Sequence, residues 1–193
     1  MIAGTEKRNT VLAVVKLANP VFIVLAICLP IGLMLVALGT ESLRTLNYAH
    51  IMTGAPWTGI DLFMGFVLGP VLGGLEPGER AAVFKRLMPK MTFLMPVLAT
   101  VTLTTGFRLA VLMGEFSLSN PRVVVALALA AILTIQGFGM ILPNEIRIFR
   151  QLLLPSPGVE KIARLGMRNA KYGGMQGLLQ VAMIFVMATL RFG

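Results

Sequence analysis

The sequence predicts an all-α membrane protein, a polytopic bundle of five transmembrane helices. Of its 193 residues, 56% are hydrophobic and 13% are charged, whereas a soluble domain carries about 25% charged residues. The mean hydropathy is +0.85. Five apolar stretches have roughly the 20 residues that a helix needs to cross a ~30 Å hydrocarbon core. We therefore expect residues 1–193 to form a single integral membrane domain.

The five predicted spans follow each other with short connections. Each is expected to be helical, because a helix satisfies its own backbone hydrogen bonds in the absence of water. The apolar run of the first span is longer than the 7–15 residues of a signal-peptide core, which favours a retained span. The second is interrupted by His50, Pro56 and Asp61. The spans are expected at residues 12–39, 46–75, 91–113, 122–142 and 172–190.

The distribution of the +9 net charge predicts the orientation of the bundle. Most basic residues precede the first span or lie between spans two and three and between spans four and five. By the positive-inside rule, the N-terminus is expected in the cytoplasm and the C-terminus outside. The pattern favours a multi-pass protein of the cytoplasmic (inner) cell membrane over a nucleic-acid-binding protein. The residues on the expected cytoplasmic side are Lys7, Arg8, Lys16, Arg80, Lys85, Arg86, Lys90, Arg147, Arg150, Lys161, Arg164, Arg168 and Lys171; opposite them stand Arg44, Arg122 and Arg191.

Residues 156–171 form a basic amphipathic segment before the last span. Lys161, Arg164, Arg168 and Lys171 recur at helical spacing, with small and apolar residues on the opposite face. We expect a short helix that lies on the anionic cytoplasmic leaflet. Docking to an acidic partner is the alternative.

Ionisable residues inside the spans are the main candidates for a functional site, because each costs about 2.5–3.5 kcal/mol to insert. His50, Gly54, Trp57 and Asp61 fall on one narrow stripe of the second span at 100° per residue. Arg108 lies in the third span. It is expected to pair either with Asp61, in a structural polar network, or with an anionic group bound near His50. Alternatively, a backbone carbonyl or a water molecule satisfies His50 as a helix-interface residue.

The single cysteine, Cys28, excludes an intramolecular disulfide, and the single histidine excludes a site with several His ligands. Methionine is abundant, at 13 residues, and its thioether can bind Cu(I) or serve as an axial haem ligand. Met88, Met91 and Met95 share one face of the third span. Their alternative role is apolar filling of the core.

The segment 50–63 (HIMTGAPWTGIDLF) has the pattern His-x6-Trp-x-Gly-x2-Leu-Phe. This pattern resembles the signature helix of the CopD/HemJ-like membrane proteins, which include copper-resistance protein D and a haem-binding protoporphyrinogen oxidase. The following segment, 86–106, is also similar to the next helix of that family, with basic residues at its start and Pro96 and Gly106 in its interior. The likeness covers about 60 residues, from Leu46 to Ala110.

This resemblance implies a helical bundle whose histidine ligates haem b or, in the copper branch, takes part in copper handling. His50 then corresponds to the ligand, and Trp57 and Gly59 to supporting positions of the motif. In a haem protein of this kind, Arg108 would face a propionate and Trp57 would pack against the ring. One histidine permits one His ligand per chain, so the second axial position would be Met, open, or supplied by another subunit.

Three functional hypotheses follow, and whether the chain is an enzyme stays open. The first is a membrane haem b protein that acts in electron transfer or porphyrin oxidation. The second is a non-catalytic subunit of a larger membrane complex or a homo-oligomer, with Gly65, Gly69 and Gly73 packing against partner helices. The third is a copper-handling protein that uses His50 together with the methionines of the third span.

Overall fold

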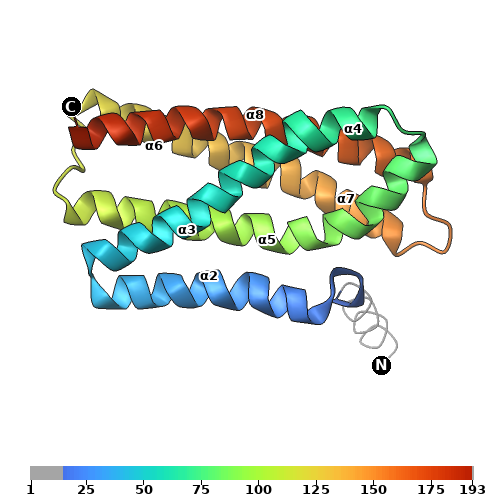
Figure 1. The fold of residues 1–193 in the computed structure, drawn as a ribbon, viewed down its shortest axis with the longest axis horizontal. Coiled ribbons are helices and arrows are strands. Elements are labelled where there is room, and N and C mark those ends of the chain that lie inside the picture. The colour runs from blue at the N-terminus through green and yellow to red at the C-terminus, as the bar shows by residue number, and fades with distance from the viewer. Residues whose placement is uncertain (1–14, 193) are drawn as a thin grey trace.

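The computed structural model describes residues 15–192, and within this range every regular element is a helix (Figure 1). Five helical segments are long and apolar enough to cross a membrane, which confirms the predicted all-α bundle. They are α2 (Pro20–Thr40), α3 (Leu43–Leu62) continued by η1 (Phe63–Leu68) and α4 (Gly69–Gly73), α5 (Pro77–Leu112), α6 (Pro121–Gln136) continued by η2 (Gly137–Ile141) and α7 (Leu142–Leu152), and α8 (Val159–Phe192). The two elements η1 and η2 are π-helical.

Short polar residues mark where the helices begin. The side chain of Asn19 accepts a hydrogen bond from the backbone N–H of Val21, and Pro20 occupies the first turn of α2. Ser42 and Asn120 cap α3 and α6 in the same way. These caps satisfy backbone N–H groups that have no partner within the helix, so the sequence encodes the turns between spans as well as the spans.

The helices run antiparallel in alternation, so α2 begins at one end of the bundle and α8 finishes at the other (Figure 1). Helix α2 lies on the outside of the bundle and packs against α3 and α5. Helix α8 contacts α3, α5 and α6 and therefore has a central position. The segment from α3 to α4 crosses α8 obliquely (Figure 1).

Two helices extend well beyond the spans predicted from hydropathy. Helix α5 begins at Pro77 and has 36 residues, about 54 Å at 1.5 Å per residue. Its first turns are too polar to be recognised as part of an apolar span. The helix nevertheless begins there, with a capping box between Glu76 and Glu79. The fourth segment likewise continues past Leu142 to Leu152.

The structure differs from the sequence-based expectation at residues 156–171. No separate surface helix forms in this part of the described chain, because Val159 begins α8 and the helix continues into the last span. Ile162, Ala163 and Leu165 are buried in a core cluster with Phe84 and Ile148. The apolar face thus packs inside the bundle, where it is shielded from water as well as it would be by lipid. The charged residues of this segment stay exposed, as expected.

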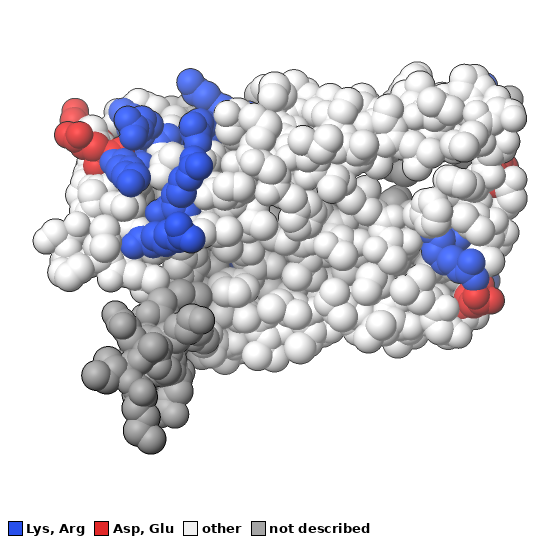
Figure 2. Space-filling model, turned by 180° about the vertical axis from the view of Figure 1, so that it is seen from behind, with Lys and Arg blue, Asp and Glu red and all other residues white. Residues whose placement is uncertain are grey.

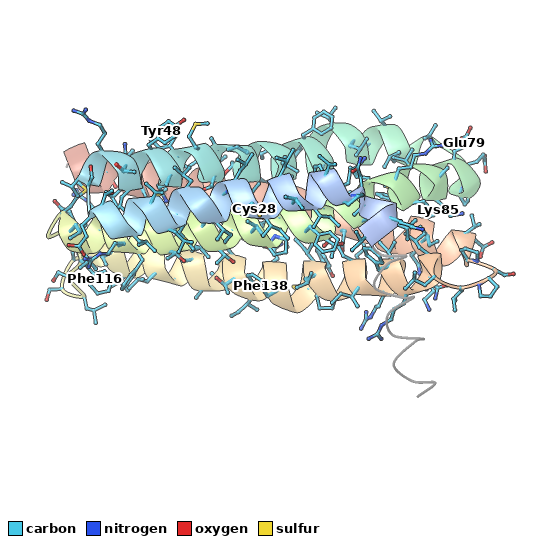
Figure 3. The ribbon with its side chains drawn as sticks, turned by 90° about the horizontal axis from the view of Figure 1, so that it is seen from below. Cys28, Tyr48, Glu79, Lys85, Phe116 and Phe138 are labelled. Atoms are coloured by element: carbon cyan, nitrogen blue, oxygen red, sulfur yellow. The ribbon has the colours of Figure 1, made fainter. Side chains whose placement is uncertain are left out.

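Basic residues gather at one end of the bundle, as the positive-inside pattern requires (Figure 2). Glu79 and Lys85 lie at this end, while Tyr48 and Phe116 lie at the other (Figure 3). Between the two ends, apolar side chains such as Leu29, Ile135 and Phe185 are more than 60% exposed. A surface of this kind faces lipid, so the chain is a multi-pass membrane protein.

Glycines allow α8 to approach the second span very closely. A Cβ atom on Gly65 would collide with the backbone of Gly174, and Gly69 lies against Ala170. These contacts are made within one chain. The expected role of Gly65 and Gly69 in binding partner helices is therefore corrected, since α8 already covers them. Gly73, the third glycine of the repeat, has no atom near its Cβ position.

Candidate functional site

The polar groups inside the bundle form two separate regions. The first, here called the His50 site, consists of His50, Thr53, Thr102 and Gly106 at the contact of α3 with α5. The second, here called the acidic cavity, is a partly open space of about 50 Å³ between α3, α5, α6–α7 and α8. Its wall contains two carboxylates, Asp61 and Glu145. The two regions are about 16 Å apart along α3, because Asp61 is eleven positions after His50 and each adds 1.5 Å.

At the His50 site, the imidazole ring is held by a backbone carbonyl. His50 Nδ1 lies 2.9 Å from the carbonyl oxygen of Thr102. A carbonyl only accepts hydrogen bonds, so Nδ1 carries the hydrogen and Nε2 of the neutral ring has a free lone pair. Nε2 has no hydrogen-bond partner among residues 15–189. The ring itself is half-buried.

Small residues make room for this ring between the helices. A Cβ atom on Gly106 would lie 2.6 Å from Cε1 and 2.8 Å from Nδ1 of His50. One turn further along α3, the methyl group of Thr102 fills the space beside Gly54, 3.1 Å from where its Cβ would be. Gly54 therefore leaves room for the Thr102 side chain of α5.

Threonine hydroxyl groups complete the polar contacts at this site. Thr102 Oγ1 donates to Thr53 Oγ1 at 2.9 Å, and Thr53 Oγ1 donates to the carbonyl oxygen of Ala49 at 2.8 Å. Each hydroxyl hydrogen thus has an acceptor. The His50 site is satisfied internally except at Nε2.

The structure does not bring Arg108 to Asp61. Arg108 forms an ion pair with Glu41, just after α2, and the two side chains are 35% and 61% exposed. Asp61 instead accepts a hydrogen bond from Gln180 of α8. The expected Asp61–Arg108 network is therefore replaced by two separate contacts. Arg108 lies close to the end of α5, where Glu41 can reach it from the adjoining turn.

Trp57 belongs to the acidic cavity and not to the His50 site. It is 4% exposed, packs against Leu98, Ala99 and Leu133, and lines the cavity. The stripe predicted on α3 therefore continues from His50 through Trp57 to Asp61, but it faces two different environments along its length.

In the acidic cavity, Asp61 is 4% exposed and packs against α8 at Gly173. The carboxylate oxygen Oδ2 accepts from Gln180 Nε2 at 3.0 Å. A Cβ atom on Gly173 would lie 3.3 Å from Asp61 Oδ1. Gln176, one turn further along α8, is 3% exposed, lines the cavity, and has no donor for its oxygen Oε1.

The other carboxylate, Glu145, is also 4% exposed and lies in the first turn of α7. Its neighbour Asn144 donates to Asn169 Oδ1 at 2.9 Å and accepts hydrogen bonds from Arg147 and Arg168. This cluster connects the cavity wall, through Asn169, with the basic end of the bundle. The sequence motif Pro143–Asn144–Glu145 thus forms part of an internal polar network.

Both π-helical elements lie beside the cavity. Met64 of η1 and Gly137, Phe138 and Ile141 of η2 contribute to its wall. A π-helical turn inserts one residue into an α-helix and is frequently found at functional sites. The α-helical pattern of backbone hydrogen bonds is thus interrupted beside the carboxylates.

The methionines of the third span line the acidic cavity, with Met88 buried in the core. Met64 joins Met88, Met91 and Met95 there, but His50 is not part of the wall. The structure therefore does not assemble a site that combines His50 with these thioethers. In the described part of the chain, no group of three or more His, Cys, Asp or Glu residues lies where it could hold a metal ion.

Several cavity residues were not identified from the sequence as site residues. Gln176 and Gln180 lie four residues apart on the last span and point to the same region. Their polar amides within an otherwise apolar helix were the available signal. Asn169 was not predicted as a site residue, because residues 156–171 were expected to lie on the membrane surface outside the bundle.

Comparison with known proteins adds no assignment: no protein-family model matches the chain, and no curated protein or solved structure is detectably similar to it.

Proposed function

We propose that the chain is an integral membrane protein that binds haem b through His50 and acts in electron transfer or porphyrin oxidation. The observation that carries the proposal is the state of the imidazole. Its Nδ1–H is held by the Thr102 carbonyl, and its Nε2 has no hydrogen-bond partner among residues 15–189. In metal-binding histidines, a backbone carbonyl that accepts the N–H of the other ring nitrogen fixes the tautomer and orients the ring. The resemblance of residues 50–63 to the CopD/HemJ-like signature supports the same conclusion.

The residues present fit one axial ligand of a haem. His50 would hold the iron through Nε2, while Thr102 and Gly106 keep the ring in place from α5. Trp57 and Arg108 do not take the roles expected for them, since the first lines the acidic cavity and the second pairs with Glu41. A bound haem would supply one-electron chemistry.

Because His50 is half-buried, a ligand bound to Nε2 would lie at the edge of the bundle. Tyr48, Ile51 and Met52 on the adjoining surface of α3 are about half exposed. An apolar macrocycle at this edge would be covered by lipid or by another subunit. The subunit hypothesis is thus compatible with haem binding, and a second chain would then complete the iron coordination.

The test is an optical spectrum of the detergent-purified chain, oxidised and dithionite-reduced, after expression with haem available. We expect a Soret band with reduced b-type bands in the wild type and loss of these bands in His50→Ala. Gly106→Ala retains the ligand but forces the ring to move, so it should lower haem occupancy or shift the spectrum. Gly32→Ala in α2 is the matched control, because nothing lies within 4 Å of its Cβ position and it lies outside the 50–63 motif.

Two results would overturn the proposal: a colourless wild type, or bands that survive in His50→Ala with unchanged intensity. Size-exclusion profiles and helical content of each variant show whether a lost spectrum reflects a lost fold. Metal analysis of the same samples separates the copper hypothesis, which requires copper that remains after haem is lost. Co-purifying membrane subunits with a colourless chain would favour the accessory-subunit hypothesis.

A further inference from the structure

The acidic cavity places two carboxylates inside the membrane without an opposing charge on its wall. Asp61 and Glu145 are the ionisable residues that line it, and no lysine, arginine or histidine does so in the described part of the chain. An ionised carboxylate at such a depth is costly unless a cation or a proton neutralises it. The neutralising proton or cation therefore does not come from a basic side chain of this wall.

Three buried amide oxygens, one on the cavity wall and two beside it, also lack hydrogen-bond donors among the described residues. The amide oxygens Oε1 of Gln136, Gln176 and Gln180 are buried and have no donor among residues 15–189. Gln176 is 97% buried and lies on the cavity wall, whereas the N–H groups of Gln180 and Gln136 are directed to Asp61 and to the carbonyl of Tyr172. An unpaired buried acceptor costs about 1–3 kcal/mol. A carboxylic acid O–H or a water molecule supplies the missing donor.

The composition of the wall favours a proton over a metal cation. A hard cation takes six or more oxygen ligands, but most of this wall consists of methionine, leucine, isoleucine and other apolar residues. The described residues include no cluster of three acidic, His or Cys ligands. A volume of about 50 Å³ has room for a few water molecules, since one needs roughly 10–15 Å³.

The charged groups nearest to this region lie at the basic end of the bundle. Arg147 and Arg168 bind the side chain of Asn144, which precedes Glu145, and Asn144 binds Asn169 on the cavity wall. This cluster is a polar connection between the cavity and the aqueous phase at the end expected to face the cytoplasm. On the other side, Asp61 is bound by Gln180, which carries no charge.

We infer that the acidic cavity is a proton-binding site, in which Asp61 and Glu145 take up and release protons and Gln176 accepts the hydrogen bond of a protonated carboxyl group. Each step converts one carboxylate and one proton into one carboxylic acid, so the site needs no other reactant. The inference does not depend on haem binding, because no residue of the His50 site lines the cavity.

The test uses dicyclohexylcarbodiimide, an apolar reagent that modifies protonated carboxyl groups, on the full chain in liposomes. Mass spectrometry of the digest should find the adduct on Asp61 or Glu145. Labelling should fall about tenfold per pH unit above the titration midpoint, as the protonated fraction does. Asp61→Asn and Glu145→Gln, which mimic the protonated side chains, should each lose their own adduct and keep the fold. Glu160→Gln is the matched control, since Glu160 is exposed on the same end of the bundle.

The inference is overturned if neither residue is labelled at any pH, or if labelling does not change with pH. It is also overturned if millimolar Na⁺ at constant pH and ionic strength abolishes the labelling, because the site would then bind a metal cation. Choline replaces Na⁺ in the control. A haem spectrum that is identical in the wild type, Asp61→Asn and Glu145→Gln keeps this result separate from the proposal on His50.

Discussion

His50 and Asp61 stand on the same face of α3, yet the surroundings of the two side chains differ in their hydrogen bonding. Around His50, every hydroxyl hydrogen has an acceptor and the unused atom is a nitrogen lone pair. Around Asp61, amide oxygens lack donors and a second carboxylate lies nearby. A free lone pair on a fixed ring suits an electron-pair acceptor such as iron. A surplus of acceptors suits protons. One helix thus carries two regions with opposite requirements.

The largest effect that we predict concerns the close contact of Gly65 in η1 with Gly174 in α8. Gly65→Ala places a methyl group on the backbone of Gly174, which cannot move without shifting α8. We expect a loss of about 3 kcal/mol in the free energy of unfolding, at the upper end of the range for overpacking. Reversible unfolding in mixed detergent micelles measures it. Haem binding at the distant His50 should persist in whatever fraction stays folded.

Gly73→Ala is the matched control, because it introduces the same methyl group in α4 with nothing within 4 Å. Its effect should stay within about 0.5 kcal/mol, as for substitutions away from packed contacts. Equal losses in the two variants would mean that the α3–α8 crossing is not the close contact that the structure shows.

The spans of this protein follow from its sequence because hydropathy and length decide them. All five were located from apolar runs, and the caps Asn19, Ser42 and Asn120 stand at the turns between them. The largely apolar middle of each span has no alternative to helical hydrogen bonding in lipid. The fold class is therefore the part that a single sequence determines well.

The partners of the polar residues did not follow from the sequence in the same way. Arg108 was expected near Asp61 from depth alone, but which helices are neighbours, and how each is rotated, depends on side-chain packing between them. With α8 packed closely against the second span at Gly65 and Gly174, Gln180 donates to Asp61 and Gln176 lines the acidic cavity. A hydropathy profile indicates how deep a residue lies in the membrane, but not which way its helix is rotated. It therefore identified His50 and Asp61 and did not identify Gln176 and Gln180.

An intermediate loss of stability is expected when the polar network beside the acidic cavity is broken, and the same kind of change at the His50 site allows a comparison. Asn144→Ala removes the donor to Asn169 and the acceptor for Arg147 and Arg168. Groups left unpaired in a buried site cost about 1–3 kcal/mol, so we expect a destabilisation of about 2 kcal/mol in the same unfolding assay.

The corresponding change at the His50 site is Thr53→Val, which removes the acceptor of the Thr102 hydroxyl. That hydroxyl can turn to a carbonyl of its own helix, so the expected loss is about 0.6 kcal/mol, the average for hydrogen bonds between membrane helices. A larger loss for Thr53→Val than for Asn144→Ala would reverse the comparison and make the His50 site the more rigid region.

The smallest effect distinguishes the two roles of Arg108. As an exposed ion pair with Glu41, it should contribute less than about 1 kcal/mol to stability, and salt should weaken that contribution. A double-mutant cycle of Arg108→Gln and Glu41→Gln measures the coupling. If Arg108 instead faces a haem propionate, Arg108→Gln should shift the haem midpoint potential while Glu41→Gln leaves it unchanged. Equal spectra and potentials in both variants, with a small coupling in stability, would establish the ion pair as the role of Arg108 and reduce the haem site to His50 and the helix α5 that orients it.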